Sequence, residues 1–117
     1  ITGDGCFRMN GQEMATESHY DIPVITFVFD NRTLGMVRQW QNLIYEKRFS
    51  QTDLGFAPDF VKLAEAYGLK GAHVSKAAIE EAKEWGHGYV VDCLIDTDEM
   101  VRPMVGGGQP ITNFMLI

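Results

Sequence analysis

Cysteine and long apolar runs are scarce in this sequence, and each shortage excludes a class of protein. The two cysteines, Cys6 and Cys93, lie far apart and belong to no Cys-x-x-Cys or Cys/His cluster. Neither a disulfide framework nor a zinc site is therefore indicated, and a reducing, cytosol-like compartment is expected. No apolar run approaches the roughly 20 residues of a membrane-spanning helix. No signal peptide precedes the first element, and the acidic balance makes an anionic membrane surface an unexpected partner.

Basic residues are also few. Ten Lys and Arg stand against 16 Asp and Glu, which gives a formal net charge of −6. Binding to phosphate arrays requires clustered bases, so nucleic acid is not an expected partner. The most basic stretch, residues 38–48, holds only three bases and one acid. A chain of 117 residues with 45% hydrophobic residues fits one globular domain, residues 1–117.

The hydrophobic pattern alternates between helix and strand periods, which is typical of a parallel sheet covered by helices on both faces. The apolar run 24–29 predicts a strand buried on both faces. The chain begins without methionine at Ile1-Thr2-Gly3, so we expect a first strand whose body is missing. The predicted elements are helix 10–20, strand 24–29, helix 35–46, a helix from Pro58 to Gly68, strand 72–74, helix 76–85 and strand 89–95. The tail from residue 96 is expected to be mostly loop that packs back through Met104, Phe114, Met115 and Leu116.

Polar residues concentrate at two predicted strand-to-helix junctions. The first is Gly3-Asp4-Gly5-Cys6 and the second is residues 30–33, Asp-Asn-Arg-Thr. Between them lies about enough chain for one helix and one returning strand, so adjacent parallel strands would place the junctions side by side. Open parallel sheets bind ligands at this carboxyl edge.

The residues at these junctions match the needs of a magnesium diphosphate. The Asp4 carboxylate, the Asn31 amide oxygen and a carbonyl near Thr33 are hard oxygen ligands, which magnesium prefers. Gly3 and Gly5 would allow close approach of a diphosphate, and amides at the start of the following helix would donate to it. Each short motif alone is a common turn; their spacing favours a site.

Gly-Asp-Gly followed by Asn31 at this interval resembles the diphosphate and magnesium motif of thiamine-diphosphate enzymes. Longer strings resemble the cofactor-binding C-terminal domain of the catalytic subunit of biosynthetic acetolactate synthases. These strings are GDGCFRMNGQEMAT (3–16), LGMVRQWQ (34–41), YEKRFS (45–50), PDFVKLA (58–64) and VRPMV (101–105). The resemblance covers essentially the whole chain. It implies a three-layer α/β/α thiamine-diphosphate-binding fold with a mostly parallel sheet.

The resemblance also implies roles for individual positions. Asp4 and Asn31 match side-chain ligands of Mg²⁺, and Thr33 matches a ligand through its main-chain carbonyl. The cofactor-binding positions are Gly3, Asp4, Gly5, Cys6, Asn31, Thr33, Gly35 and Met36. Met36 and Trp40 match positions that line the substrate and inhibitor channel, whereas their spacing alone favours core packing. The chain departs from the family at Asp30, where Asn is frequent, and at Cys6, where Ser or Ala is more usual.

The implied reaction is decarboxylation of pyruvate and transfer of its two-carbon unit to a second 2-keto acid, pyruvate or 2-ketobutyrate, in branched-chain amino acid biosynthesis. The implied full-length enzyme also binds FAD, forms a homodimer or homotetramer, and can include a small regulatory subunit. Its activating Glu belongs to an N-terminal domain, so we expect no catalytic residue here and an inactive fragment. The expected location is the cytoplasm of a bacterium, or the stroma or matrix of a eukaryotic organelle.

Two other functions and several residues remain open at this stage. The chain could belong to another thiamine-diphosphate-dependent decarboxylase or carboligase, or it could be a non-catalytic partner-binding module of the same fold. The three histidines have no metal spacing and are expected at the surface or in loops. Asp92 interrupts an apolar strand, and either caps a neighbouring helix or faces solvent at a strand edge.

Overall fold

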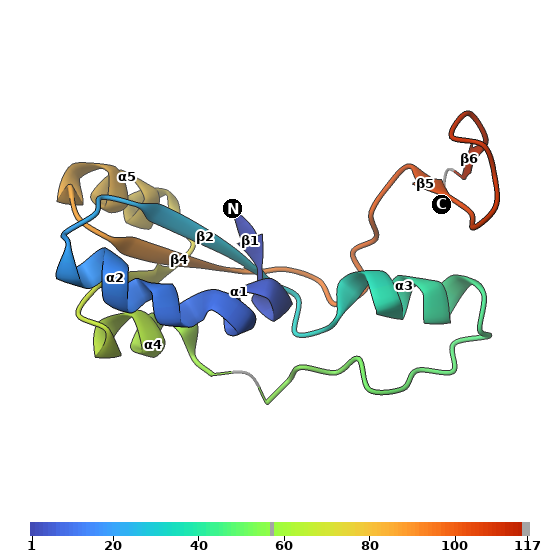
Figure 1. Cartoon of the computed structure of the whole chain (residues 1–117), viewed down its shortest axis with the longest axis horizontal. Helices are drawn as coiled ribbons and strands as arrows, with labels where there is room; N and C mark the ends of the chain where they lie inside the picture. The colour runs from blue at the N-terminus through green and yellow to red at the C-terminus, as the bar shows by residue number, and fades with distance from the viewer. Residues whose placement is uncertain (57, 116–117) are drawn as a thin grey trace.

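Four parallel strands form a sheet in the part of the molecule drawn at the left of Figure 1. The computed structural model describes residues 1–56 and 58–115. The strands are β1 (Thr2–Gly3), β2 (Ile25–Asp30), β3 (Lys70–His73) and β4 (Tyr89–Leu94), in the spatial order β1-β2-β4-β3. β2 and β4 are central and pair along their full length. β4 is buried up to Cys93, whereas Phe29 of β2 is 41% exposed, so the predicted burial of residues 24–29 on both faces is wrong for part of the strand.

Helices cover the two faces of this sheet, as Figure 1 shows. α1 (Asp4–Asn10), the 3₁₀ turn η1 (Gly11–Glu13), α2 (Met14–His19) and α4 (Phe60–Ala66) lie on one face, and α5 (Lys76–Trp85) lies on the other. Each face has its own core. One joins Phe7, Met14, Val28, Phe60, Ala64, Leu69 and Val90, and the other joins Ala82, Tyr89, Val91 and Cys93. The predicted α/β/α layering is confirmed.

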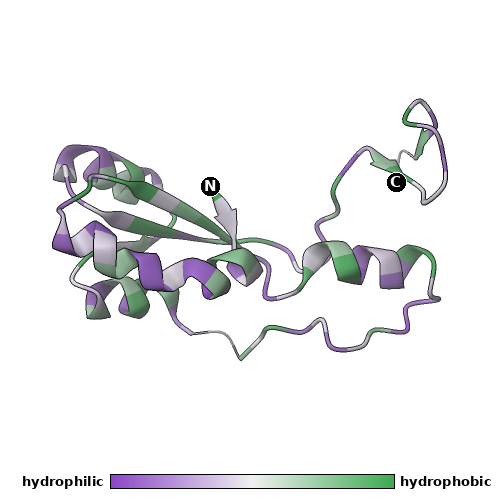
Figure 2. Ribbon diagram, viewed as in Figure 1, coloured by the Kyte–Doolittle hydropathy of each residue, from purple (hydrophilic) through white to green (hydrophobic). Residues whose placement is uncertain are grey.

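Short-range chemistry sets the ends of two helices. The Asp59 carboxylate accepts from the backbone N–H of Lys62 at 3.1 Å and caps α4, and the Ser75 hydroxyl caps α5 in the same way. Gly86 ends α5 in the left-handed conformation, with φ +71°. Figure 2 shows how hydropathy is distributed: the strands are mainly hydrophobic, and the helices carry both hydrophobic and hydrophilic residues.

α3 (Gly35–Leu43) projects away from the sheet beside the tail (Figure 1). Gln39, buried within α3, donates to the carbonyl of Val101 and accepts from its N–H. Arg38 forms a two-point ion pair with Asp98, with Nε–Oδ1 at 2.7 Å. The tail ends in the short antiparallel pair β5 (Met104–Val105) and β6 (Phe114–Met115). No helix in the described part of the chain has the length and apolar character needed to cross a membrane.

Several predicted boundaries are wrong. The first helix begins at Asp4 rather than residue 10, because burial of Phe7 against the edge of Phe60, at 5.5 Å between ring centroids, outweighs the low helix propensity of the neighbouring glycines. α3 ends at Leu43. Pro58 precedes the α4 cap rather than opening the helix.

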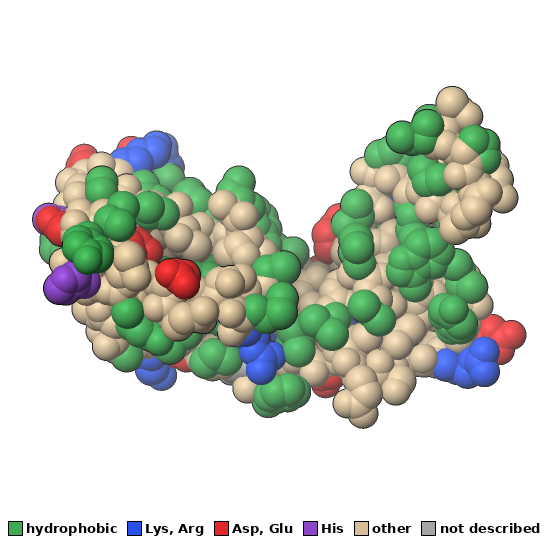
Figure 3. Space-filling model, viewed as in Figure 1, with side chains coloured by type: hydrophobic (Ala, Val, Ile, Leu, Met, Phe, Trp, Pro, Cys, Tyr) green, Lys and Arg blue, Asp and Glu red, His purple; other side chains and the backbone are tan. Residues whose placement is uncertain are grey.

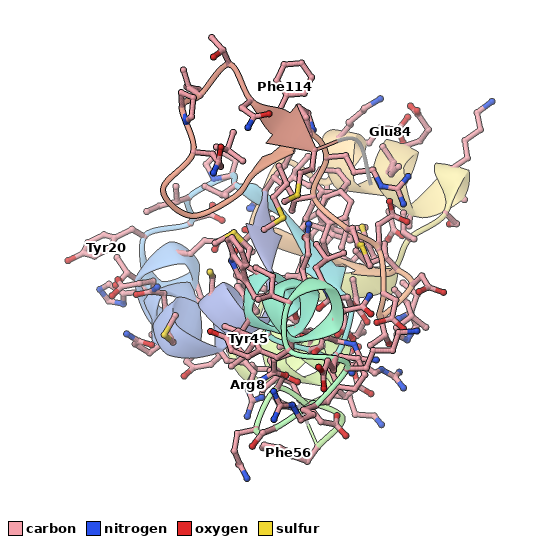
Figure 4. All side chains as sticks on the ribbon, turned by 90° about the vertical axis from the view of Figure 1, so that its right-hand side faces the viewer. Arg8, Tyr20, Tyr45, Phe56, Glu84 and Phe114 are labelled. Carbon is pink, nitrogen blue, oxygen red and sulfur yellow. The ribbon has the colours of Figure 1, made fainter. Side chains whose placement is uncertain are left out.

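The tail does not pack back onto the core as expected. Phe114 and Met115 are exposed on β6, and Figure 4 shows Phe114 standing clear of the sheet. Met104 is partly buried and its sulfur contacts Gln39 of α3. Leu116 lies outside the described residues. The tail is therefore attached through α3 rather than through the hydrophobic core.

Candidate functional site

The β1–β2 pairing places the two polar junctions side by side. Gly3 lies opposite Phe29 in the register, so Asp4 leaves β1 where Asp30 ends β2. This is the carboxyl edge of the sheet, where parallel sheets bind ligands. Because α1 begins at Asp4, its first turn, rather than a helix starting at residue 10, faces this edge.

A cavity of about 550 Å³ lies between this edge, α3 and the start of the tail. All eight positions predicted to bind the cofactor line it: Gly3, Asp4, Gly5, Cys6, Asn31, Thr33, Gly35 and Met36. Figure 3 shows the notch between the part of the molecule that carries the sheet and the part that carries α3 and the tail. The structure thus brings these residues together, and their roles toward a cofactor stay predictions.

Asp4 is the most unusual residue of this cavity. Its side chain is buried, with only 2% of the residue exposed, and its Oδ2 accepts no hydrogen bond. Burial raises the pKa of Asp4, and the nearby Asp30 raises it further, although the N–H of Gly5 lowers it. A buried carboxylate oxygen without a donor is costly unless a cation or a proton binds to it.

Asn31 and Thr33 are held beside Asp4 by a tightly bonded loop. The Asn31 Oδ1 accepts from the N–H of Thr33 at 3.1 Å, and the Thr33 hydroxyl donates to the carbonyl of Thr52 at 2.7 Å. Arg32 between them has φ +56°. An amide oxygen has two lone pairs, so Asn31 keeps one for a further partner.

Gly35 keeps the Asn31 amide in place. A Cβ added at Gly35 would lie 2.9 Å from Asn31 Nδ2, so any other residue would push this side chain aside. Gly5 is similarly close to Leu34, with 3.2 Å between an added Cβ and Cδ2. These contacts give both glycines a steric role in shaping the cavity wall.

The residue set fits a magnesium ion better than a transition metal. Within residues 1–56 and 58–115, no group of three or more His, Cys, Asp or Glu side chains is arranged to hold a metal. The residues present offer one carboxylate, one amide oxygen and backbone carbonyls. Magnesium accepts so few protein oxygens because phosphate oxygens and water complete its octahedron.

Met36 and Trp40 lie in neighbouring hollows rather than in one. Met36 is 68% exposed and lines the cavity with Asp4. Trp40 lines an apolar hollow of about 590 Å³ with Tyr45 and Arg48. Val37 lines both, so the two hollows adjoin.

Sequence reasoning missed the tail side of the cavity. Glu99, Met100 and Val101 line it, and they are held there by Gln39 and by the ion pair between Arg38 and Asp98. The one local signal was Gln39 beside the apolar residues of the predicted helix 35–46. A buried polar side chain needs hydrogen-bond partners, so Gln39 could have indicated a contact with another segment.

Asp92 is neither a helix cap nor exposed at an edge. It lies in the central strand β4, is 7% exposed, and pairs through Oδ2 with Nδ1 of His73 at 3.1 Å. His73 occupies the directly opposing position on β3. The His73 side chain is 72% exposed, in agreement with its predicted surface position.

Comparisons with known proteins agree with this arrangement. Residues 1–93 match the family model "Thiamine pyrophosphate enzyme, C-terminal TPP binding domain". The chain is 52% identical over 120 residues to a probable acetolactate synthase large subunit of Methanocaldococcus jannaschii, covering 98% of this chain and 20% of that protein. It is 43% identical over 119 residues to the acetolactate synthase isozyme 3 large subunit of Escherichia coli, covering 93% and 21%. The chain therefore spans about a fifth of the length of these relatives.

A solved structure supports the fold. The thiamine diphosphate-dependent 4-hydroxybenzoylformate decarboxylase of Rhodococcus jostii matches with a TM-score of 0.74 and 25% identity, over 83% of this chain and 19% of that one. The resemblance to acetolactate synthases inferred from the sequence strings is confirmed by the curated relatives. The chain belongs to the family of C-terminal TPP-binding domains of thiamine pyrophosphate enzymes.

Proposed function

We propose that this chain is the cofactor-binding part of an acetolactate synthase catalytic subunit and binds thiamine diphosphate with Mg²⁺ in the 550 Å³ cavity. The observation that carries the proposal is the buried Asp4 with its unpartnered Oδ2. A divalent cation on this oxygen would satisfy it and would neutralise the diphosphate. The identities of 52% and 43% with the two acetolactate synthases named above, against 25% with the decarboxylase, favour this reaction over other members of the family.

Each residue has a separate task in this proposal. Asp4 and Asn31 hold the metal through side-chain oxygens and Thr33 holds it through its carbonyl. Gly3 and Gly5 leave room for the diphosphate, and the first-turn amides of α1 donate to it. Cys6, Gly35 and Met36 complete the wall, as their positions around the cavity support.

When bound, thiamine diphosphate supplies the electron sink for decarboxylation of a 2-keto acid. The residues of this chain hold the diphosphate and position the cofactor. We propose that the whole enzyme decarboxylates pyruvate and transfers the two-carbon unit to pyruvate or 2-ketobutyrate. FAD, further subunits and the activating Glu are proposed to belong to the rest of that enzyme.

Isothermal calorimetry of the chain tests the cofactor site. Thiamine diphosphate should bind with Mg²⁺ present and lose its affinity when a chelator is in excess, and Asp4→Ala should abolish binding. Glu84→Gln on α5 removes an equal charge far from the cavity and should bind normally. Unchanged affinity with the chelator, or in Asp4→Ala, contradicts the proposal.

Trp40→Leu separates the cofactor site from the proposed channel. Because Trp40 does not line the cavity with Asp4, the variant should bind thiamine diphosphate as the parent chain does. In the full-length enzyme it should change the KM for the second 2-keto acid, measured by condensation of pyruvate with 2-ketobutyrate. Loss of cofactor affinity in Trp40→Leu would contradict the separation of the two hollows.

A further inference from the structure

A second polar hollow of about 360 Å³ opens at the same edge of the sheet, on the side of α4. We call it the acidic hollow and define it by Asp30, Arg32, Asp59, Phe60, His73 and Asp92. Among the described residues, none that lines it also lines the cofactor cavity. The predicted cofactor and metal positions therefore do not account for it.

Most charged groups of the acidic hollow already have partners. Asp59 caps α4 and pairs with Lys62 at 3.1 Å. Asp30 accepts from the N–H of Arg32 at 3.0 Å, and its other oxygen lies 3.8 Å from the Arg32 Nε. Because Arg32 is 58% exposed, this second contact is a loose surface pair.

Asp92 is the exception. It is 93% buried, and His73 occupies Oδ2 while Oδ1 has no hydrogen-bond partner. Burial raises the pKa of Asp92, Asp30 raises it further, and His73 lowers it. Val28 lies opposite Asp92 in the register, and Asp30 is two residues beyond Val28, so both carboxylates are on one face of the sheet.

The unpartnered Oδ1 of Asp92 is satisfied either by a proton or by a donor from outside, and the surplus of carboxylates around it favours a donor that carries positive charge. A metal ion fits less well here than at the cofactor cavity, because no diphosphate is expected here to add oxygens to the protein ligands, and the described residues contain no group of three His, Cys, Asp or Glu side chains arranged to hold a metal by themselves. A guanidinium or alkylammonium group can donate hydrogen bonds to carboxylates on one of its sides only. Its other side can lie against an aromatic ring such as that of Phe60. Three carboxylates against one Arg and one His make the hollow electronegative.

We propose that the acidic hollow binds a small organic cation of the guanidinium or alkylammonium class, with an N–H group donating to Asp92 Oδ1 and the charge facing Asp30. This site shares no lining residue with the thiamine-diphosphate cavity, although Asp30 lies close to both Asp4 and Asp92. The cation can be a free small molecule or the end of a basic side chain, and the two sources differ in size.

The test is a titration of the chain with methylguanidinium, followed by NMR at the His73 Cε1–H. The chain has three histidines, and the His73→Gln spectrum assigns the signal. We expect a saturable shift of His73 and at least a tenfold loss of affinity in Asp92→Asn. Asp21→Asn is the matched control, because Asp21 also pairs with a histidine, His87, but both side chains are exposed. The Asp21→Asn variant should bind methylguanidinium as the parent chain does.

Three results would overturn the proposal: no saturable shift of His73, equal affinity in Asp92→Asn, or an Mg²⁺-induced shift that Asp92→Asn abolishes. Methylurea, the neutral isostere, keeps the test decisive on the unmodified chain if Asp92→Asn does not fold, because an equal shift with methylurea would refute a cation site. Nα-acetylarginine amide distinguishes the source. Binding of this bulkier probe supports a protein side chain, and its rejection alongside binding of methylguanidinium supports a free cation.

Discussion

Asp4→Asn should change stability in opposite directions with and without cofactor. The Asp4 carboxylate is buried and its Oδ2 has no donor. In the cofactor-free chain this charge opposes folding, and its removal should therefore stabilise the protein. With Mg²⁺ and thiamine diphosphate present the same charge is the proposed metal ligand, so its removal should cost the stabilisation that binding provides.

The size of each effect follows from the surroundings of Asp4. A buried polar atom left unsatisfied costs about 1–3 kcal/mol, and more when it is charged. Its place in the first turn of α1 returns about 0.3–1 kcal/mol through the helix dipole. Asparagine keeps an oxygen for the N–H of Gly5, so we expect the cofactor-free variant to gain about 1 kcal/mol. Ligand at a hundredfold excess over its Kd stabilises the parent chain by roughly 2.7 kcal/mol, and Asp4→Asn should gain none of this.

Urea denaturation followed by circular dichroism, with and without Mg²⁺ and thiamine diphosphate, measures both effects. Glu84→Gln is the control. Figure 4 shows Glu84 on α5, projecting into solvent, and surface substitutions of this kind change stability by less than about 0.5 kcal/mol. The reasoning is refuted if Asp4→Asn destabilises the cofactor-free chain by more than about 1 kcal/mol, or if it keeps the cofactor-induced stabilisation.

Three further predictions concern packing, pH and the tail. Gly71→Ala should destabilise the chain by about 1–3 kcal/mol in urea denaturation, because an added Cβ would lie 3.1 Å from the backbone of Val61. Gly107 has open space around it, so Gly107→Ala should leave stability unchanged. Equal effects of the two substitutions would contradict the close packing of Gly71 on Val61. Burial raises the pKa of Glu17, so the native state holds this proton more tightly than the unfolded state. Stability should therefore fall as pH rises from the ordinary Glu pKa through the raised value, and Glu17→Gln should flatten this fall in melts across pH 4–8. Gln39→Ala removes the hydrogen bonds between α3 and residue 101, so limited proteolysis should cut the tail several-fold faster, while an unchanged rate would show that the tail is held elsewhere.

Helix and strand identity were largely readable from the sequence. The run 76–85 has a Ser cap before it and Gly86 after it, and its predicted bounds agree with α5. Both signals are local, since they depend on hydrogen bonds within one turn. The first helix was misplaced because its start depends on a distant contact, the packing of Phe7 on Phe60.

Part of the cavity lining could be predicted from the sequence, because some of its residues follow directly after predicted strands. Gly3-Asp4-Gly5 and Asn31 stand at the ends of strands, and the spacing of the strands along the chain predicted that they meet. Met36 was placed by resemblance. The contribution of residues 99–101 was not predicted, because it depends on hydrogen bonds to Gln39 across about 60 positions of chain, which leave no periodic signal.

The sequence by itself determined the α/β class, the two polar junctions and the family, because the hydrophobic period and the short motifs depend only on residues close together in the chain. Only the tertiary structure decided that Asp4 is buried without a donor, that Trp40 lies in a hollow of its own, and that Asp92 faces His73 and an open cavity. Burial and partner choice depend on strand register and helix packing, and these are set by contacts between residues distant in the chain.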